Sequence, residues 1–354
     1  MRVHLVEQGG RGGVFQHTCA LATILGSHGL EVRMHTASDP EFDATTPGVE
    51  VCGCVEWFRH RPARRVLIAS HYVGVTLPHL SCDVTREDIV HVQGMWNPLL
   101  VALTLGLLRA KARRTVLSPH NTFARSGALV DELLLRWSCR VAQTTVVFSE
   151  FDRQNLQRRD IDAVVSPLVQ LVPDTTNHGS WRETWGAGSR RVVLFAGQLR
   201  PDKGLDRLIE ALREFDDPPL LAVVGEDKGA LRSSMALADE TGIPVHWSVG
   251  FQPLERFVGA IRAADVVVCP YARASQSGVL SIASALGVPS VATAVGGIGE
   301  SADEAVAADD LGGLVEAIET ALERPRSPGM SEAMDVAWRV HADAYRLCAS
   351  EQSS

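Results

Sequence analysis

The sequence predicts an α/β protein with two domains, each built on a doubly wound parallel sheet and facing the other across a cleft. Short apolar runs alternate with helical patterns along nearly the whole chain, which is typical of parallel strands joined by helical crossovers. The length of 354 residues suits about two domains of ~150 residues, each able to bury its own core.

The N-terminal domain is predicted to span residues 1–175. Its apolar runs predict strands at residues 3–6, 29–34, 66–70, 89–92, 115–118 and 144–148. Helical patterns separate these runs, at about 14–27, 98–111, 126–140 and 150–158. Because helices connect the strands, we expect the strands to pair in parallel.

A polar, glycine-bearing stretch over residues 174–189 predicts a linker. The C-terminal domain then spans 190–330, with strands predicted at 192–195, 220–224, 245–249, 266–269 and 290–293. Helices are predicted at about 205–212, 229–241, 253–263, 277–286 and 311–323. A last amphipathic helix, 331–350, carries its apolar residues on one face: Val336, Val340, Ala344 and Leu347.

The net charge is −8, so the protein as a whole does not resemble a nucleic-acid-binding protein. Basic residues nevertheless gather in two clusters, Arg59, Arg61, Arg64 and Arg65, and Arg109, Lys111, Arg113 and Arg114. One interpretation is a solvated face. The other is a patch that contacts anionic lipid or a phosphorylated acceptor, and thus a peripheral membrane contact.

Seven cysteines are scattered along the chain, and the spacing of the closest pair, Cys52 and Cys54, fits no zinc pattern. Scattered cysteines in odd number are typical of reduced intracellular thiols. The N-terminus lacks the long apolar core of a signal peptide, and the apolar stretch 98–108 is shorter than the ~20 residues of a membrane span. We expect a cytoplasmic protein that uses no cofactor and no metal ion.

In open α/β sheets, ligands bind at the carboxyl ends of the strands, so the loops that follow strands are the candidate sites. The first loop, residues 7–13, is glycine-rich and could bring backbone amides close to a phosphate. It matches neither the dinucleotide fingerprint nor a P-loop, and a tight turn explains it equally well. The second contains His120 at the end of a strand; a structural histidine is the alternative there.

Two loops of the C-terminal half carry stronger signals. Residues 197–204 place Arg200 and Lys203 between two glycines ahead of a helix, although a helix-capping turn with solvated charges gives the same pattern. Residues 270–281 lead into an almost uncharged helix, whose N-terminus at Ser277 and Gly278 could hold a phosphate. A plain N-cap is the alternative for Ser277. A further glycine-rich loop, 294–300, follows the last strong strand.

Taken together, these loops resemble family 4 of the retaining glycosyltransferases (glycosyl transferases group 1). That family has the GT-B fold, two Rossmann-like domains with an interdomain cleft. The resemblance covers nearly the whole chain and is strongest over 195–204, 223–226, 264–270 and 287–297. In the N-terminal half it rests on Gly12-Gly13, residues 90–96 and residues 118–121. The last helix, with Trp338 and Tyr345, resembles the one that returns to the N-terminal domain in this fold.

The resemblance implies a hexosyltransferase that uses a UDP- or GDP-sugar donor and a hydroxyl acceptor, which is a small metabolite, a glycan or a lipid-linked intermediate. The C-terminal domain would bind the donor and the N-terminal domain the acceptor. Arg200 and Lys203 would hold the donor pyrophosphate, and Gly13 would meet it from the other domain. His120 would contact the transferred sugar. The distal phosphate would bind the amides of Gly278, Val279 and Leu280.

The sequence departs from the family pattern at three positions. The usual arginine of the phosphate loop is Gln198 here, with Arg200 as its substitute. The family carries two glutamates eight positions apart, one for the sugar hydroxyls and one for the ribose, and here those positions hold Ala274 and Ile282. Gln276 is the nearby side chain that could take the first role. Two other functions therefore stay open: a nucleotide-sugar epimerase or hydrolase on the same fold, and a non-catalytic protein that binds a nucleotide sugar.

Overall fold

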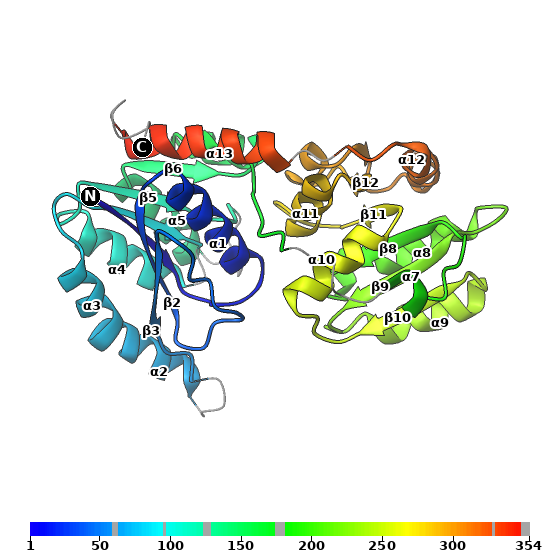
Figure 1. Cartoon of the computed structure of the whole chain (residues 1–354), viewed down its shortest axis with the longest axis horizontal. Helices are drawn as coiled ribbons and strands as arrows, with labels where there is room; N and C mark the ends of the chain where they lie inside the picture. The colour runs from blue at the N-terminus through cyan, green and yellow to red at the C-terminus, as the bar shows by residue number, and fades with distance from the viewer. Residues whose placement is uncertain (59–62, 95–96, 123–128, 174–180, 328–329, 348–354) are drawn as a thin grey trace. The chain divides into compact units, whose positions relative to one another are not determined.

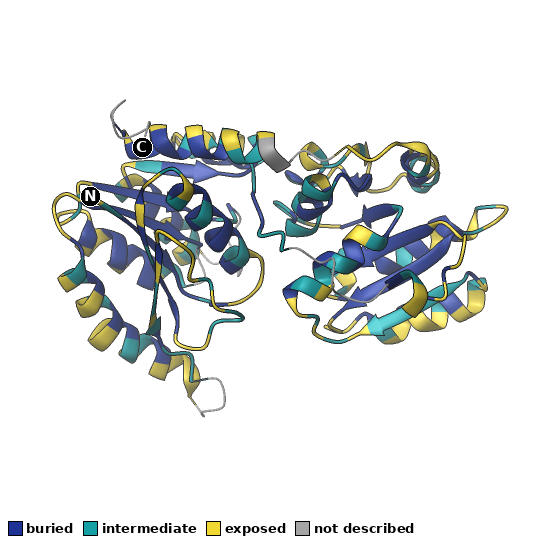
Figure 2. Ribbon diagram, in the orientation of Figure 1, coloured by how far each residue is buried: buried dark blue, intermediate teal, exposed yellow. Residues whose placement is uncertain are grey.

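The computed structural model describes residues 1–58, 63–94, 97–122, 129–173, 181–327 and 330–347 (Figure 1). The chain divides into two compact units: unit 1 is Met1–Leu171 with Met334–Ser354, and unit 2 is Val172–Ala333. In each unit the strands are largely buried and the helices expose their outer faces (Figure 2). Among the described helices, none is long and apolar enough to cross a membrane.

Unit 1 contains a parallel seven-stranded sheet with the order β3-β2-β1-β4-β5-β6-β7. The strands are β1 (Arg2–Glu7), β2 (Glu31–Ala37), β3 (Val49–Val55), β4 (Ile89–Gln93), β5 (Arg114–Ser118), β6 (Thr144–Val147) and β7 (Val164–Val165). The strand order reverses between β1 and β4. The loops after these two strands therefore flank the point where doubly wound sheets bind ligands.

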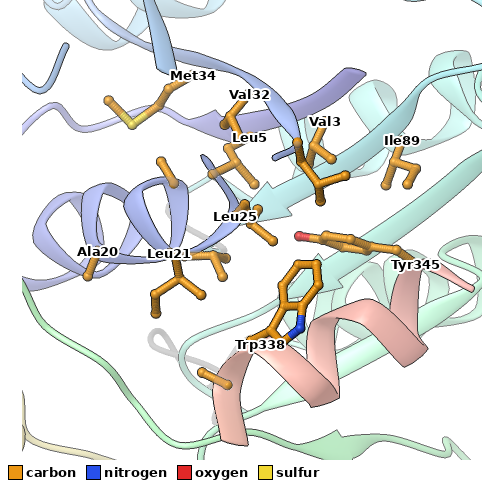
Figure 3. Packing of buried hydrophobic residues seen from close by; sticks show 14 of the residues in the cluster. Val3, Leu5, Ala20, Leu21, Leu25, Val32, Met34, Ile89, Trp338 and Tyr345 are labelled. Atoms are coloured by element: carbon orange, nitrogen blue, oxygen red, sulfur yellow. The ribbon is translucent and has the colours of Figure 1, made fainter. Parts of the chain in front are cut away.

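Helices cover both faces of this sheet. On one face, α1 (Gly12–Ser27) and α13 (Met330–Tyr345) share a core with β1, β2 and β4. Figure 3 shows Trp338 and Tyr345 extending from α13 into this cluster, beside Leu25 of α1. On the other face lie α3 (Leu77–Asp83), α4 (Pro98–Leu108), α5 (Leu129–Val141) and α6 (Glu150–Gln157).

The strand predicted at 66–70 is wrong, because these residues belong to helix α2 (Arg64–His71). A short apolar run in the sequence indicates a sheet strand only where the fold buries its side chains. Here Val66 is 65% exposed and only Ile68 of the helix is buried. The strand that follows β2 is instead β3, in which Val49 and Val55 are buried.

Unit 2 contains a parallel six-stranded sheet with the order β10-β9-β8-β11-β12-β13. The strands are β8 (Val192–Ala196), β9 (Leu220–Gly225), β10 (Val245–Val249), β11 (Val266–Cys269), β12 (Ser290–Thr293) and β13 (Glu304–Val306). Here the order reverses between β8 and β11. One face packs against α8 (Leu205–Arg213), α9 (Leu231–Thr241) and α12 (Leu311–Glu323). Two more helices, α10 (Leu254–Ala263) and α11 (Gly278–Leu286), pack against each other and contact β8 and β11.

Part of the predicted linker belongs to the core of unit 2. Residues 174–180 lie outside the described residues, but a short helix, α7 (Trp181–Thr184), follows them. Trp181 and Trp185 are both buried, and the Trp181 indole donates to the carbonyl of Arg256 at 2.9 Å. Helix α7 packs against α10, and the two tryptophan rings contact each other at 5.4 Å between centroids. The polar residues around them concealed this packing in the sequence.

Candidate functional site

The loops after β8 and β11 meet at the switch point of unit 2. Gly204 ends the first loop with a positive φ of 70°, and a Cβ there would lie 2.0 Å from the carbonyl oxygen of Pro270. The amide of Ala272 donates to the carbonyl of Asp202 at 2.9 Å. Only glycine permits this approach, because any side chain would overlap the neighbouring backbone. The two loops are therefore fastened together as one rigid edge.

Lys203 and Arg200 both lie in this edge. The Lys203 ammonium group sits 3.6 Å from the ring centroid of Tyr271, a cation–π contact. Burial lowers the pKa of Lys203, since desolvation disfavours its charged form. Arg200 is paired with Asp202, its Nε donating to Oδ1 at 2.8 Å. A bound anion would therefore contact the partly desolvated ammonium group of Lys203. It would have to compete with Asp202 for the guanidinium group of Arg200.

The N-terminus of α11 lies against the same loop. Ser277 is buried at the N-cap with extended backbone, but its hydroxyl makes no capping hydrogen bond and lies 3.9 Å from the sulfur of Cys269. Ser277 therefore occupies the N-cap position, but its side chain does not cap the helix. The first amides of a helix have no partner within it and favour negative charge. Gly278 and Val279 are half-buried and Leu280 is buried. The Val279 side chain would lie 3.9 Å from a Cβ at Gly197.

Two further residues of the loop before α11 bear on the predictions. Gln276 is half-buried, one position before the N-cap. Its neighbour Ser275 accepts a hydrogen bond from the amide of Gly297 at 3.1 Å, which joins the loop after β12 to this edge. Ile282 is 1% exposed, inside the core. An isoleucine side chain has no hydrogen-bonding group, so residue 282 cannot fill the role of the family's second glutamate.

In unit 1, His120 follows β5 in a left-handed conformation with φ of 57°. Its Nε2 donates to the Gln93 side-chain oxygen at 2.8 Å, and its ring packs 4.6 Å from that of Phe148. Burial and, second, the nearby His17 hold the pKa of His120 well below its ordinary value. The imidazole is therefore neutral at pH 7, which makes it a hydrogen-bonding group and not a cation.

Sequence reasoning missed the network that supports His120. The Gln93 amide nitrogen lies 3.2 Å from His91 Nε2, which lies 2.8 Å from the hydroxyl of Ser118. The other ring nitrogen of His91 lies 2.9 Å from the hydroxyl of Tyr345 on α13. His91 and Gln93 alternate in β4, so the period of two could have indicated that they share one face. The C-terminal helix thus reaches His120 through buried hydrogen bonds.

In the glycine-rich loop of unit 1, backbone amides already donate hydrogen bonds to carboxylates of the protein. The amides of Gly9 and Gly10 donate to Glu7 at 2.7 and 2.8 Å, and the amide of Gly12 donates to Glu41 at 2.9 Å. Burial raises the pKa of Glu7. Gly13 is exposed in the first turn of α1. Of the glycines predicted to approach a phosphate, Gly13 is the one whose amide meets none of these carboxylates.

The basic clusters are only partly a surface feature. Arg59 and Arg61 lie outside the described residues, whereas Arg64, Arg65, Arg109, Lys111 and Arg113 are exposed. Arg114 was predicted to belong to the second cluster, and it is instead buried in β5. Its Nε donates to the carbonyl of Ala344 in α13 at 2.6 Å. This residue fastens the C-terminal helix to the sheet and does not contribute to a surface patch.

Comparisons with known proteins identify the class. Residues 11–170 match the family model described as Glycosyltransferase Family 4, and residues 190–324 match the model described as Glycosyl transferases group 1. The D-inositol 3-phosphate glycosyltransferase of Xylanimonas cellulosilytica is 32% identical, over 87% of this chain and 80% of that protein. Its counterpart in Mycolicibacterium smegmatis is 28% identical, over 89% of this chain and 80% of that protein.

Solved structures give the same fold. Sucrose-phosphate synthase from Thermosynechococcus elongatus aligns with a TM-score of 0.70 at 17% identity, over 99% of this chain and 96% of that chain. Anabaena HepE, solved in complex with UDP and glucose, aligns with a TM-score of 0.71 at 15% identity, over 98% and 95%. The molecule is a glycosyltransferase of the GT-B fold. It belongs to glycosyltransferase family 4, as the sequence motifs predicted.

Proposed function

We propose that this glycosyltransferase moves a hexose from a nucleoside-diphosphate sugar to a hydroxyl acceptor, with retention of configuration and without a catalytic metal ion. The observation that carries the proposal is the convergence of Arg200, Lys203 and the α11 N-terminus at the switch point of unit 2. Breaking a sugar–phosphate bond leaves negative charge on the diphosphate. Cations and helix amides fixed in place stabilise that charge.

The donor contacts follow from this arrangement. Arg200 and Lys203 bind the pyrophosphate, and the amides of Gly278, Val279 and Leu280 bind its distal phosphate. Gln276 contacts the sugar hydroxyls, and Ser277 at the helix N-terminus belongs with the phosphate-binding amides. We assign Gly13 of unit 1 a contact with the diphosphate. Each charge-assisted hydrogen bond contributes about 1.5–3 kcal/mol.

We further propose that His120 contacts the transferred sugar and is not a nucleophile. In a retaining reaction the acceptor hydroxyl approaches on the side of the leaving group, so the diphosphate itself can take the hydroxyl proton. The neutral imidazole of His120 can orient a sugar hydroxyl without repelling the positive charge that develops on the sugar ring. The hydrogen bond from His120 to Gln93 restricts the orientation of the ring.

The test is a panel of UDP-, GDP- and ADP-sugars, each incubated with and without acceptors and without added Mg²⁺ or Mn²⁺. D-inositol 3-phosphate, named for the relatives above, belongs in the acceptor set. Turnover only with acceptor, and an unchanged anomeric configuration by NMR, support the proposal. Turnover without acceptor would instead show an epimerase or hydrolase. Binding without any turnover would show a non-catalytic nucleotide-sugar protein.

A lipid-linked acceptor is favoured by an apolar surface on unit 1. Helices α4 and α5 pack side by side. They approach closely at Gly106 of α4, where an added Cβ would lie 3.1 Å from the ring of Trp137 on α5. Along their outer faces, seven large apolar side chains are exposed, between 40% and 82%: Leu99, Leu103, Leu107, Leu129, Val130, Leu133 and Trp137. Exposed Arg109 and Lys111 follow α4 directly. Apolar residues bordered by cations are typical of surfaces that bind anionic membranes.

Vesicle flotation tests this peripheral contact. We expect the protein to float with phosphatidylglycerol vesicles and not with phosphatidylcholine vesicles. Leu133→Asp should abolish flotation, whereas Met235→Asp should not, since Met235 is 41% exposed on α9 of unit 2. Equal flotation of both variants would remove the membrane from the proposal. The six described cysteines are free, in keeping with the reducing cytoplasm that we propose as the compartment.

A further inference from the structure

A cluster of two cysteines and two histidines lies at one edge of the unit 1 sheet, apart from the residues assigned to sugar transfer. His35 comes from β2, Cys52 and Cys54 from the edge strand β3, and His79 from α3. Cys52 pairs directly with His35 in the sheet register. The register then shifts, so that Cys54 is left opposite no residue of β2. A bulge of this kind turns a side chain toward a site that a regular strand would not reach.

Three of the four side chains, those of His35, Cys52 and Cys54, lie close to the separations that a tetrahedral zinc ion requires. His79 Nε2 is 3.3 Å from Cys52 Sγ, and His35 Nδ1 is 3.9 Å from Cys54 Sγ. The ligand atoms of His35, Cys52 and Cys54 all lie within 4.8 Å of one another. Bonds of about 2.3 Å to sulfur and 2.0–2.1 Å to nitrogen place neighbouring tetrahedral ligand atoms about 3.3–3.8 Å apart. Small side-chain adjustments therefore suffice for these three, whereas the exposed His79 imidazole must turn from Cys52 toward the other two ligands to complete the set.

The second ring nitrogen of His35 is already oriented by buried groups. Its Nε2 lies 3.0 Å from His4 Nδ1 and 3.5 Å from Asp83 Oδ2. Arg33 holds the other carboxylate oxygen of Asp83 at 2.9 Å. Within the described residues, buried Oδ2 of Asp83 accepts no hydrogen bond. Histidines that bind zinc through one nitrogen usually donate the other N–H to a carboxylate or carbonyl, and Asp83 offers that acceptor.

We propose that His35, Cys52, Cys54 and His79 bind one zinc ion in a structural site that fastens β3 to β2 and to α3. Thiolate and imidazole ligands in a tetrahedral set select zinc. Two S–H bonds break and two zinc–sulfur bonds form, the two thiol protons pass to solvent, and nothing is oxidised or reduced. Exposed His79 gives the ion an entry path. This site takes no part in transfer and stands independently of the donor proposal.

The sequence spacing concealed the cluster, because its ligands come from three elements. Cys52 and Cys54 flank a single residue, whereas the histidines lie 17 and 27 positions away from Cys52.

Metal analysis of the full chain, purified from zinc-supplemented cells, tests the site. We expect about one zinc per chain, and we expect the cobalt-substituted protein to show the thiolate-to-cobalt charge-transfer band and the intense visible bands of tetrahedral cobalt. Cys52→Ser and Cys54→Ser should lose both the zinc and the band. Cys82→Ser, an exposed thiol on α3 outside the cluster, should keep them. Loss in Cys82→Ser, or no cobalt band in the unmodified chain, would overturn the proposal.

A folding failure of the cysteine variants would mimic loss of zinc, so milder changes provide a second test. Asp83→Asn and His79→Ala should each weaken zinc affinity by about 10- to 100-fold, measured by competition with a chromogenic chelator. In the unmodified chain, zinc should protect two thiols from maleimide and a chelator should expose them. Unchanged affinity in both variants, or a Cys52–Cys54 disulfide found by mass, would contradict the zinc site.

Discussion

Units 1 and 2 have the same doubly wound topology, yet the chemistry at their switch points is opposite in sign. In unit 2, Arg200, Lys203 and the α11 N-terminus present positive charge and helix amides. In unit 1, the corresponding glycine-rich loop has its amides bound to Glu7 and Glu41. The crevice at the switch point can therefore attract an anionic ligand, as in unit 2, or already contain carboxylates of the protein itself, as in unit 1.

The difference shows that topology locates a ligand crevice but does not assign its ligand. The charged and hydrogen-bonding groups that line the crevice determine which ligand binds there. We assign the diphosphate to unit 2, whereas unit 1 offers a neutral histidine held by Gln93, His91 and Tyr345. The donor proposal depends on this contrast, and the following changes break or sharpen it.

The largest effect is expected for His120→Ala. Turnover should fall by about 100- to 1000-fold, because a group that orients the sugar in the transition state is lost. Affinity for UDP or GDP, measured by calorimetry, should stay within about twofold, since unit 2 supplies the diphosphate contacts. His246→Ala in β10 of unit 2 is the control. Full turnover in His120→Ala would make the histidine structural.

Gly225→Ala should damage unit 2 through its backbone. Gly225 has a φ of 151°, and a Cβ there would lie 1.7 Å from the carbonyl oxygen of Gly197 at the start of the donor loop. We expect a loss of about 3 kcal/mol in the free energy of unfolding, from strain and overlap together. Gly229→Ala, with a φ of 104° but nothing within 4 Å, should lose only the strain part. Equal losses in urea titrations of both variants would contradict the close approach.

Arg200→Ala and Lys203→Ala should each weaken nucleoside-diphosphate binding by about 10- to 100-fold, which corresponds to one charge-assisted contact. Lys203 should show the larger loss, because Arg200 is already paired with Asp202. Arg213→Ala, at the exposed end of α8, is the matched control. If calorimetry finds both affinities unchanged, the loop is only a helix cap.

Acid should destabilise unit 1 before unit 2. Burial lowers the pKa of His17 to about 3 and of His341 to about 4, below the ~6.5 expected in the unfolded chain. Their stabilising contribution is present above pH ~6.5 and is lost as pH falls toward the folded values. From pH 7 to pH 5, each should cost up to about 2 kcal/mol of unfolding free energy. The unit 2 residues that the structure describes include one histidine, His246.

Denaturant titrations at pH 7 and pH 5 measure this loss. His341→Gln should lose less stability than the unmodified chain over this interval, because one buried histidine no longer titrates. His246→Gln should lose as much as the unmodified chain. A pH dependence that His341→Gln leaves untouched would show that other groups govern acid unfolding.

The sequence predicted most of the fold because the strands of parallel sheets are apolar runs, and burial on both faces makes them conspicuous. The prediction failed where an apolar run is not buried, or where buried residues stand alone in a polar stretch. The run at 66–70 is apolar but exposed on α2, and Trp181 and Trp185 are buried inside a polar stretch. Single apolar residues in a polar context carry no periodicity, so only packing reveals them.

For the site, sequence reasoning located loops but not contacts. Arg200 and Lys203 follow a strand, and their loop meets α11 as the motif order predicts. The carboxylates on Gly9, Gly10 and Gly12 were not foreseen, because Glu41 lies 29 positions from Gly12. Hydrogen bonds between distant segments, such as His91 with Tyr345, depend on helix α13 closing over the sheet.

Hydrogen–deuterium exchange with and without a saturating nucleoside diphosphate tests the central contrast most directly. The account predicts slower exchange in residues 197–204 and in the first turn of α11, at Gly278, Val279 and Leu280. Gly9 and Gly10 should exchange unchanged, because Glu7 already holds their amides. Protection at Gly9 and Gly10 with none in unit 2 would contradict the account, since it would place the diphosphate in the crevice that carries carboxylates.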